Sequence, residues 1–430
     1  MAILRRRDNF DVAISIPSAR YVSAAFAERE HERLWPRVWQ LACAVDHVAS
    51  PGDYYEHQLG SLSVLVVRGE DGGLRAFQNA CRHRGSALCE GTGSSLTEIR
   101  CPFHRWTWDL AGKLREIPSR RVFELGANDL PLIPVQVDTW GPLVFVNLAG
   151  DAEPLSDFLG EVPADCAWAR IDEMRCILTT TAPTRCNWKT LIDGFSETYH
   201  VQGIHREMLP MCDDVNGPQV VWKRHGKLEQ SYGLPSPRMR EVSDQAVWDA
   251  FVEIMGVRVG NLEQRDAGPA PPVGPGGTMR SAIAEIVRSR GVEAGHDWFA
   301  DLDDRRLLDM QQYNLFPNLT VLVFSDMLQV VRSRPGPTPD DAHMDTFMFA
   351  RYPAGDTTPR VQPPAMSFDY DDDLPIGLVL DQDFKNFARS QRGMHQPGLT
   401  HLTVSESEEC RIVNLHRNLE EYLALAPGEV

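Results

Sequence analysis

The segment Cys81-Arg82-His83-Arg84-Gly85 is followed, after a loop rich in Gly and Ser, by Cys101-Pro102-Phe103-His104-Arg105-Trp106. Each segment offers one thiol and one imidazole, spaced C-x-H in the first and C-x-x-H in the second, with seventeen residues between His83 and Cys101. Thiolate and imidazole groups are ligands for zinc and for iron–sulfur clusters. The spacing therefore predicts one metal centre held between two loops.

Two kinds of metal centre use two Cys and two His. Structural zinc sites usually place like ligands together, spaced C-x2-4-C and H-x3-5-H. In a Rieske [2Fe-2S] centre, two His replace two Cys on one of the irons. Because each segment supplies one Cys and one His, we predict a Rieske centre, with structural zinc as the alternative. The predicted ligands are Cys81, His83, Cys101 and His104.

A second candidate metal site lies downstream, where Asn187-Trp188-Lys189 precedes Glu197-Thr198-Tyr199-His200 and His205. Two His and one carboxylate with open coordination positions form the facial triad of non-haem Fe(II) oxygenases. On a regular helix, at about 100° per residue, His200 and His205 would lie roughly 140° apart and could not share a metal. We therefore expect the helix to be interrupted at Gly203, with Glu197 on the same face as His200.

The two His require a carboxylate from elsewhere in the chain. Leu380-Asp381-Gln382-Asp383 precedes a helical run from Phe384 to Gly393 and offers two candidates. Either Asp can ligate a metal or cap the helix. The residue pattern alone leaves this choice open.

Length and composition describe a globular protein with room for two domains. The chain has 430 residues, of which 43% are hydrophobic and 24% charged, and its nine Cys lack the density of a disulfide framework. The formal net charge of -17 argues against non-specific nucleic-acid binding. Neither a signal peptide nor a membrane span is visible, so we expect a cytoplasmic protein without a membrane partner.

The hydrophobic pattern changes along the chain. Residues 18–39 have the periodicity of an amphipathic helix, and residues 41–148 form short strands and turns, with a hairpin at 61–79. We expect three parts: an N-terminal helical segment at 1–40, an all-β domain at 41–155, and a larger domain with the second metal motif at 156–430.

The motifs and their order resemble the alpha subunit of Rieske non-haem iron ring-hydroxylating oxygenases. The resemblance rests on both Cys/His segments, on Asn187-Trp188-Lys189, and on Glu197-Thr198-Tyr199-His200 with His205, and it covers nearly the whole chain. It implies an α+β fold: an all-β Rieske [2Fe-2S] domain, then a helix-grip (START-like) catalytic domain with a mainly antiparallel sheet. The N-terminal helical segment would pack on the catalytic domain. Asp383 is the implied third iron ligand, ahead of Asp381.

The resemblance also implies cofactors and partners. A Rieske [2Fe-2S] cluster and a mononuclear Fe(II) would receive electrons from NAD(P)H through a partner reductase, often by way of a ferredoxin. Glu197 would link His104 of one subunit to His200 of the next, because in the family the two metal centres of one subunit are far apart. This arrangement implies a homotrimer, with or without a small beta subunit. Asp193 and Val201 are expected to line the substrate pocket.

The implied function is that of a terminal oxygenase component. It would use O2 to monohydroxylate, dihydroxylate or demethylate an aromatic or other hydrophobic ring-containing substrate. The alternative is a Rieske electron-transfer or binding protein without oxygenase activity. The chain departs from the family at Arg105, where Gly commonly follows the second cluster His. We expect a cation there to raise the cluster potential or to reshape the surface that an electron donor meets.

Overall fold

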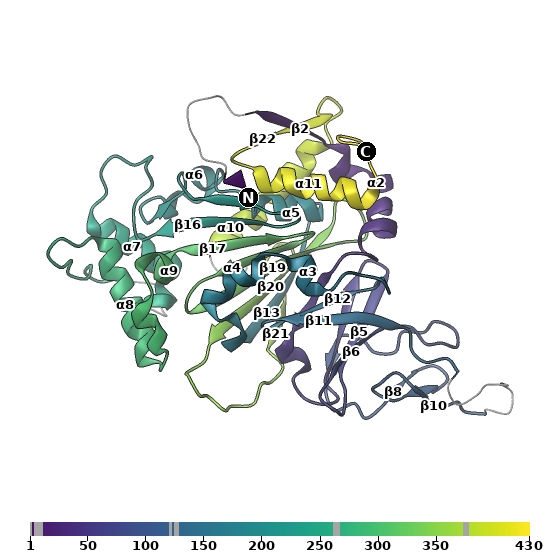
Figure 1. Ribbon diagram of the computed structural model, residues 1–430. Coiled ribbons are helices and arrows are strands. Elements are labelled where there is room, and N and C mark those ends of the chain that lie inside the picture. The colour runs from purple at the N-terminus through teal and green to yellow at the C-terminus, as the bar shows by residue number, and fades with distance from the viewer. Residues whose placement is uncertain (1, 4–11, 120–122, 124–128, 261–266, 373–377) are drawn as a thin grey trace.

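The computed structural model describes residues 2–3, 12–119, 123, 129–260, 267–372 and 378–430. Figure 1 shows a smaller all-β part beside a larger part in which helices cover a long sheet. Within the described residues, no helix combines the length and the apolar character needed to cross a bilayer.

The smaller part contains the hairpin expected from the sequence. β5 (Leu62–Arg68) pairs antiparallel with β6 (Leu74–Gln78), which confirms that prediction. These strands belong to a seven-stranded sheet with the order β3 (Gln40–Ala44), β12 (Leu143–Asn147), β11 (Pro134–Trp140), β6, β5, β4 (Tyr54–Leu59) and β7 (Thr92–Gly93). A second sheet is formed by β10 (Leu114–Glu116), β9 (Thr107–Trp108) and β8 (Ile99–Arg100).

The larger part is built on a ten-stranded sheet. Its main path runs through β1 (Ala2–Ile3), β15 (Gln219–Val221), β16 (Gly226–Tyr232), β17 (Met310–Leu315), β18 (Leu319–Val323), β19 (Met327–Pro335), β20 (Ala342–Arg351), β13 (Met174–Thr184) and β21 (Ala365–Ser367), while β14 (Cys212–Asp213) pairs with β16. Only β13 and β21 pair in parallel among the described strands of this sheet. The sheet is therefore mainly antiparallel, as expected.

The two faces of the large sheet meet different parts of the molecule, because successive side chains of a strand point to opposite faces. On β19, Ser333 Oγ donates a hydrogen bond of 2.6 Å to the carbonyl of Trp188 in α5 (Trp188–Gly194). Its neighbour Arg332 points the other way, and its Nη1 donates to the carbonyls of Leu41 and Ala42 in β3 at 2.7 Å. One face of β19 therefore meets α5, and the other meets the all-β part.

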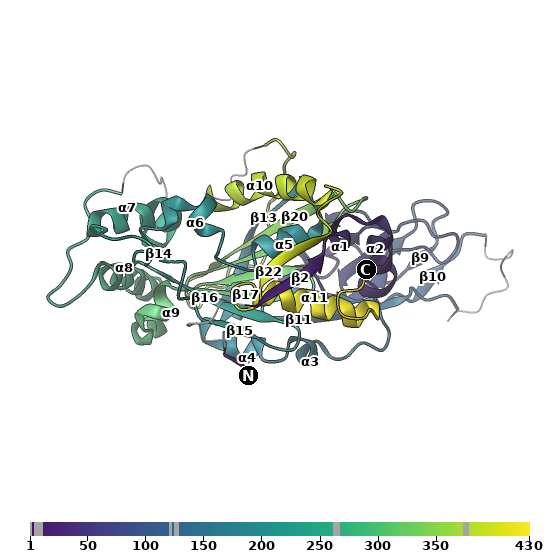
Figure 2. The same cartoon turned by 90° about the horizontal axis from the view of Figure 1, so that it is seen from above.

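The helices fall into two groups. α5, α10 (Leu378–Met394) and α11 (Cys410–Leu423) cover the sheet, and α6 (Val201–Ile204) lies close to α10 and α7 (Figures 1 and 2). α7 (Asp244–Met255), α8 (Met279–Glu293) and α9 (Asp304–Leu308) gather at the end of the molecule opposite the strands β9 and β10 (Figure 2). The connection between the two parts contains α3 (Leu155–Leu159) and α4 (Val162–Cys166).

The N-terminal segment contains more than the single helix expected at 18–39. It divides into α1 (Ala19–Val22), α2 (Ala24–Arg29) and a π-helical turn at Glu30–Leu34. The division falls at Ser23, whose Oγ caps α2 by accepting a hydrogen bond from the Phe26 N–H. Before these helices, β2 (Ala13–Pro17) pairs with β22 (His401–Ser405) near the C-terminus.

A buried ion pair fastens this segment to α5. Lys189 Nζ lies 2.6 Å from Glu30 Oε1, and Trp188 Nε1 donates to Glu30 Oε2 at 3.0 Å. The side chains of Lys189 and Glu30 are 0% and 2% exposed. Burial raises the pKa of Glu30 and lowers the pKa of Lys189, so each charge depends on its partner.

We expect Glu30→Leu to lower the free energy of unfolding by about 3–5 kcal/mol, because it leaves the Lys189 ammonium buried without a partner. The measurement is chemical denaturation of the purified variant. Glu32 is exposed, and Glu32→Gln serves as the control, with an expected change within about 0.5 kcal/mol. A double variant, Glu30→Leu with Lys189→Met, should recover much of the loss. An equal loss in the single and double variants would contradict this account.

Candidate metal centres

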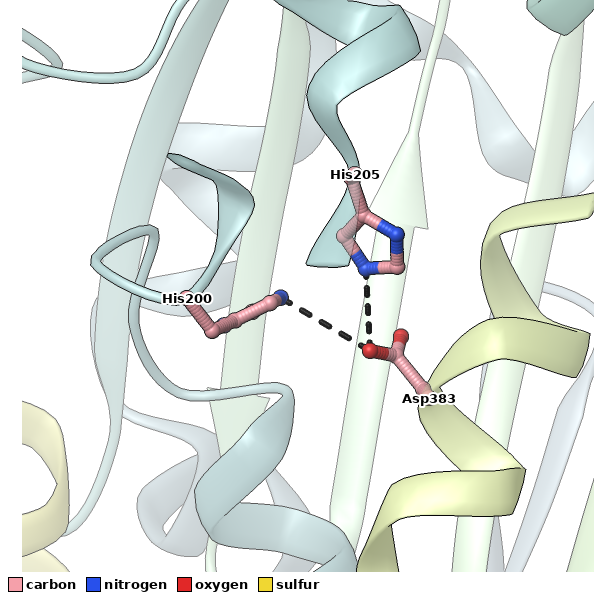
Figure 3. A group of neighbouring side chains, drawn as sticks. All are labelled: His200, His205 and Asp383. Atoms are coloured by element: carbon pink, nitrogen blue, oxygen red, sulfur yellow. Dashed lines mark hydrogen bonds and ion pairs between the residues drawn. The ribbon is translucent and has the colours of Figure 1, made fainter. Parts of the chain in front are cut away.

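Three side chains from two distant parts of the chain meet at the helix-covered face of the sheet. Figure 3 shows His200, His205 and Asp383, the last of which comes from α10. His205 Nε2 lies 2.9 Å from Asp383 Oδ1, and His200 Nε2 lies 3.8 Å from the same oxygen. One ligand atom from each residue lies within 4.8 Å of the others. These are the donors of a 2-His-1-carboxylate Fe(II) site.

The short helix α6 separates the two His. Because it spans Val201–Ile204, His200 precedes it and His205 follows it with φ of -117° and ψ of 48°. The interruption therefore lies at His205, and not at Gly203, which is inside the helix. Ending the helix at His205 releases its ring from helical spacing, and the two ring centroids lie 5.2 Å apart.

Hydrogen bonds orient both imidazole rings. His200 Nδ1 lies 2.6 Å from Glu197 Oε1, and the backbone N–H of His200 donates to Glu197 Oε2 at 2.9 Å. His205 Nδ1 lies 2.6 Å from Gln382 Oε1. An acceptor at Nδ1 holds the proton there and leaves Nε2, which faces Asp383, as the ligating nitrogen. No sequence motif predicted this contact of Gln382, and its position next to Asp383 is the one sequence feature that could have indicated it.

The site attracts positive charge. Burial lowers the pKa of His200, but the hydrogen bond and charge of Glu197 and the charge of Asp383 outweigh burial, so the pKa is raised. A raised imidazole pKa records a negative potential at the ring. The same potential favours binding of a divalent metal between the three side chains.

Asp383, and not Asp381, faces the two His. The two residues are about 200° apart on a helix, so only one can point to the metal site. Asp381 Oδ2 pairs with Lys385 Nζ at 2.8 Å, whereas the Asp383 side chain is 4% exposed. α10 begins at Leu378, earlier than the expected start at Phe384, so both Asp lie within the helix and neither is its N-cap.

The three side chains open onto a cavity of about 370 Å³ between the sheet and helices α6, α7 and α10. Tyr232 and Phe324 contribute stacked rings with centroids 6.3 Å apart, and Val201 lies in the wall, as the resemblance implied. Methionine side chains adapt their shape to a ligand. Five line this cavity: Met208, Met255, Met310, Met327 and Met348.

Asp193 does not line this cavity, which corrects the expectation from the sequence. It lies on the side of α5 that faces α1 and α11, where Tyr21 Oη donates to Asp193 Oδ2 at 2.5 Å. Tyr21 Oη also lies 2.8 Å from His416 Nε2. Burial raises the pKa of Asp193 to about 7. Asp193 therefore joins three parts of the chain instead of contacting a substrate.

The four predicted cluster ligands lie on two loops of the all-β part, one after β6 and the other after β8. The rings of His83 and His104 have centroids 4.7 Å apart, and the thiols of Cys81 and Cys101 are close enough to hydrogen-bond. Both Cys are free of disulfides. His83 Nδ1 is buried and has no hydrogen-bond partner within the described chain. These loops therefore present the donors of a Rieske cluster.

The two cluster loops form matching turns. Gly85 N–H donates to Cys81 O at 2.9 Å, and Arg105 N–H donates to Cys101 O at 3.1 Å. Gly85 has φ of 76° and Arg105 has φ of 61°. The turn requires a positive φ, which Gly adopts freely and which costs other residues about 1 kcal/mol. This is the physical reason for Gly at the Arg105 position in the family motif.

The fold and the two donor sets define a class of protein: a Rieske domain followed by a mononuclear non-haem iron domain. Residues 171–425 match the family model "Ring hydroxylating alpha subunit (catalytic domain)", and residues 38–134 match "Rieske [2Fe-2S] domain". The chain belongs to the Rieske ring-hydroxylating oxygenase family. This confirms the resemblance seen in the sequence, together with its α+β fold and its two iron cofactors.

Several relatives are named as oxygenases of quaternary ammonium compounds. The chain is 30% identical over 221 residues to the glycine betaine monooxygenase oxygenase subunit of Pseudomonas aeruginosa, which covers 51% of each chain. It is 28% identical over 228 residues to the carnitine monooxygenase oxygenase subunit of Escherichia coli, covering 52% of this chain and 60% of the relative. It is 32% identical over 197 residues to the chloroplastic choline monooxygenase of Spinacia oleracea, covering 44% and 45%. The matches span about half the length of these relatives.

Solved structures extend the likeness over the whole fold. The quaternary ammonium Rieske monooxygenase CntA with L-carnitine superposes with a TM-score of 0.67 at 18% identity, covering 96% of both chains. Naphthalene 1,2-dioxygenase from Rhodococcus with indole also gives 0.67, at 19% identity, covering 96% of this chain and 95% of the other. At these identities the two structures establish the fold alone.

We expect anaerobically purified protein to contain about three irons and two acid-labile sulfides per chain. His205→Ala should lose only the mononuclear iron and keep the Rieske EPR signal of the reduced sample. Cys101→Ser should lose the cluster and its red-brown colour. His395 is exposed, follows the end of α10 and belongs to neither donor set, so His395→Ala should keep all three irons. Zinc without sulfide in the wild type would contradict both assignments.

Proposed function

We propose that this chain is the oxygenase component of a Rieske system that demethylates a quaternary ammonium compound. One atom of O2 is inserted into a C–H bond of an N-methyl group, and the other leaves as water, with two electrons and two protons consumed. The N-hydroxymethyl product then releases formaldehyde and leaves a tertiary amine. When bound, Fe(II) supplies O2 activation and the cluster supplies single electrons.

The observation that carries this proposal is the chemistry of the cavity beside His200, His205 and Asp383. Its walls are mostly apolar, and the described residues that line it include no Lys or Arg. Glu253 of α7 stands in the wall, without an ion pair to any described residue. Apolar walls, aromatic rings and a carboxylate together suit a methylated ammonium group.

The relatives support a cationic substrate over the aromatic one that the sequence resemblance favoured. Those reported above are named for glycine betaine, carnitine and choline. The likeness to naphthalene 1,2-dioxygenase supports only the fold. The alternative of a protein without oxygenase activity has no support, because the three candidate iron ligands converge as one site.

The direct test supplies the metal-loaded protein with a Rieske reductase, NAD(P)H and a panel of trimethylammonium compounds. We expect O2 uptake and formaldehyde release in equal amounts with at least one of them. If the reductase reduces the cluster and no compound yields formaldehyde, the proposed function is wrong.

We expect Glu253→Gln to raise KM for a cationic substrate about 1.4- to five-fold, because an exposed ion pair contributes about 0.2–1 kcal/mol. The effect should fade as salt screens the charge. kcat should change little, since Glu253 is not one of the three side chains of the candidate metal site. Glu293→Gln, at an exposed site on α8, is the matched control. An unchanged KM at low salt would show that Glu253 does not contribute to substrate binding.

We infer that electrons pass between copies of the chain in a homotrimer, fed by a partner reductase. The strands β8 and β10 in Figure 1, and β9 and β10 in Figure 2, lie beside the cluster loops and far from helix α6. Phe103, next to His104, and Tyr199, next to His200, are each 61% exposed, although both are large and apolar. Such side chains are typical of contact surfaces. We propose that Glu197 joins His104 of one copy to His200 of the next.

We expect Glu197→Gln to lower kcat about 10- to 100-fold with both metals still bound, because the carboxylate orients His200 and forms the link. Single-turnover kinetics should show a slower loss of cluster electrons than in the wild type. Glu241 is exposed, and Glu241→Gln is the control. Wild-type turnover by a fully metallated Glu197→Gln protein would show that the link is wrong.

A further inference from the structure

The floor of the cavity is long in one direction. It includes a floor row of side chains at paired register positions on β17, β18, β19, β20 and β13: Gln312, Leu322, Gln329, Met348 and Leu178. Paired positions on neighbouring strands point to the same face of a sheet, so the row is continuous. Because neighbouring strands lie about 4.8 Å apart, the row across five strands is roughly 19 Å long.

The cavity is larger than a small betaine requires. Its volume of about 370 Å³ is in the range of sites that hold drug-sized ligands. The trimethylammonium head has to lie beside His200, His205 and Asp383, because an N-methyl group must be close to the reacting centre to be oxidised. Glycine betaine adds only a short acid to that head and would leave most of the floor row uncovered. The remaining length suits a long substituent.

Side-chain hydrogen-bond donors in the wall are used within the protein. Thr198 Oγ1 donates to the carbonyl of Asp214 at 3.1 Å. Tyr232 Oη donates to Gln230 Oε1 at 3.2 Å, and the Gln230 amide nitrogen lies 3.7 Å from Cys212 Sγ. The substrate therefore competes with existing partners for each of these donors.

The two amides of the floor row add no free donor. Gln312 Nε2 donates to the carbonyl of Phe195. Gln329 Nε2 is buried and does not face the cavity. The Nδ1 atoms of the two metal-binding imidazoles face their own acceptors, Glu197 and Gln382. An anionic group of a substrate would therefore meet few side-chain donors in the described wall.

The charges of the wall also disfavour an anion. Glu197, Glu253 and Asp383 are its acidic residues, and none of the described lining residues is Lys or Arg. A bound divalent metal would be balanced by Asp383 and Glu197, which leaves no cation for a substrate carboxylate. Burial of an unpaired carboxylate is costly, whereas an apolar substituent gains free energy from contact with side chains such as Leu322 and Met348.

We propose that the cavity takes a quaternary ammonium compound whose nitrogen carries a long apolar substituent and no carboxylate. The trimethylammonium head lies at the metal-binding side chains, and the substituent extends along the floor row. This inference rests on the proposed demethylation and names its substrate class. It separates this chain from the relatives named for glycine betaine and carnitine, since those two compounds each carry a carboxylate.

A homologous series tests the inference on the metal-loaded wild type. The probes are tetramethylammonium and its butyl-, hexyl- and octyltrimethylammonium analogues, kept below the concentration at which they form micelles. Binding is measured by calorimetry, and KM and kcat by formaldehyde release. Affinity should rise about two- to four-fold for each added CH2, because each is removed from water against the apolar floor. Butyltrimethylammonium should bind at least about ten-fold more tightly than γ-butyrobetaine, which has a similar length and a carboxylate.

Two neighbouring positions on β13 separate the floor row from general apolar binding. Leu178 lies at the end of the row, whereas Ile177 does not line the cavity and is 43% exposed. Leu178→Trp shortens the row, so it should weaken octyltrimethylammonium binding about 5- to 20-fold and leave tetramethylammonium within about two-fold. Ile177→Trp is the matched control and should leave the whole series unchanged. Iron content and thermal unfolding show that each variant is folded and loaded.

The outcomes distinguish this inference from the proposed function. If glycine betaine or γ-butyrobetaine binds more tightly and is demethylated faster than the alkyl compounds, the inference is wrong and the proposed function stands. Equal affinity along the wild-type series would also overturn the inference, and so would an equal loss in the folded Leu178→Trp and Ile177→Trp proteins. If the cluster is reduced and no compound, alkyl or betaine, releases formaldehyde, the proposed function fails and the inference fails with it.

Discussion

The alternation of side chains on the large sheet is the constraint on which the rest of the structure depends. On β19, Arg332 points to the all-β part, while Gln329 and Ser333 point to the cavity and to α5. Arg332 Nε also pairs with Asp345 Oδ2 of β20 at 2.9 Å, and both side chains are 3% exposed. Burial raises the pKa of Asp345, but its two Arg partners hold it well below its usual range. A slip of one residue would exchange the faces and bury unpaired charge against the helices.

The metal-binding side chains depend on how α10 is seated above that sheet. Gln391 of α10 accepts hydrogen bonds through Oε1 from the Asn187 N–H at 2.9 Å and from Thr190 Oγ1 at 3.2 Å. This buried amide joins α10 to the start of α5, two turns along the helix from Asp383. The same helix supplies Asp383 to the metal site and Gln382 to His205. The placement of α10 therefore sets the position of one ligand, Asp383, and the orientation of another, His205.

Residues of similar type have different hydrogen-bond partners in the fold. Asp193 and Glu197 are both acidic residues close to His200, but Asp193 bonds Tyr21 behind α5, whereas Glu197 bonds His200 itself. Gln312 and Gln329 both line the cavity, and Gln312 also donates a hydrogen bond to the carbonyl of Phe195.

The sequence by itself determined the two metal motifs, the hairpin and the change from a β-rich segment to a larger domain with the second motif, while the mainly antiparallel fold followed only from the resemblance. These features are local: ligand spacing such as C-x-H, strand alternation and turn residues act over a few positions. It also placed the late carboxylate at Asp383 or Asp381, although only the resemblance favoured Asp383.

Tertiary structure alone decided the features that depend on contacts between distant segments. The placement of α10 determines that Asp383 faces the metal site and that Asp381 pairs with Lys385 instead. Asp193 points away from the cavity because α1 and α11 pack behind α5. Gln382 carries no motif, because its contact with His205 joins elements that are distant in the sequence. Composition and residue spacing indicate which ligands or secondary structure one segment can provide. Burial and strand register determine which side chains of other segments it contacts.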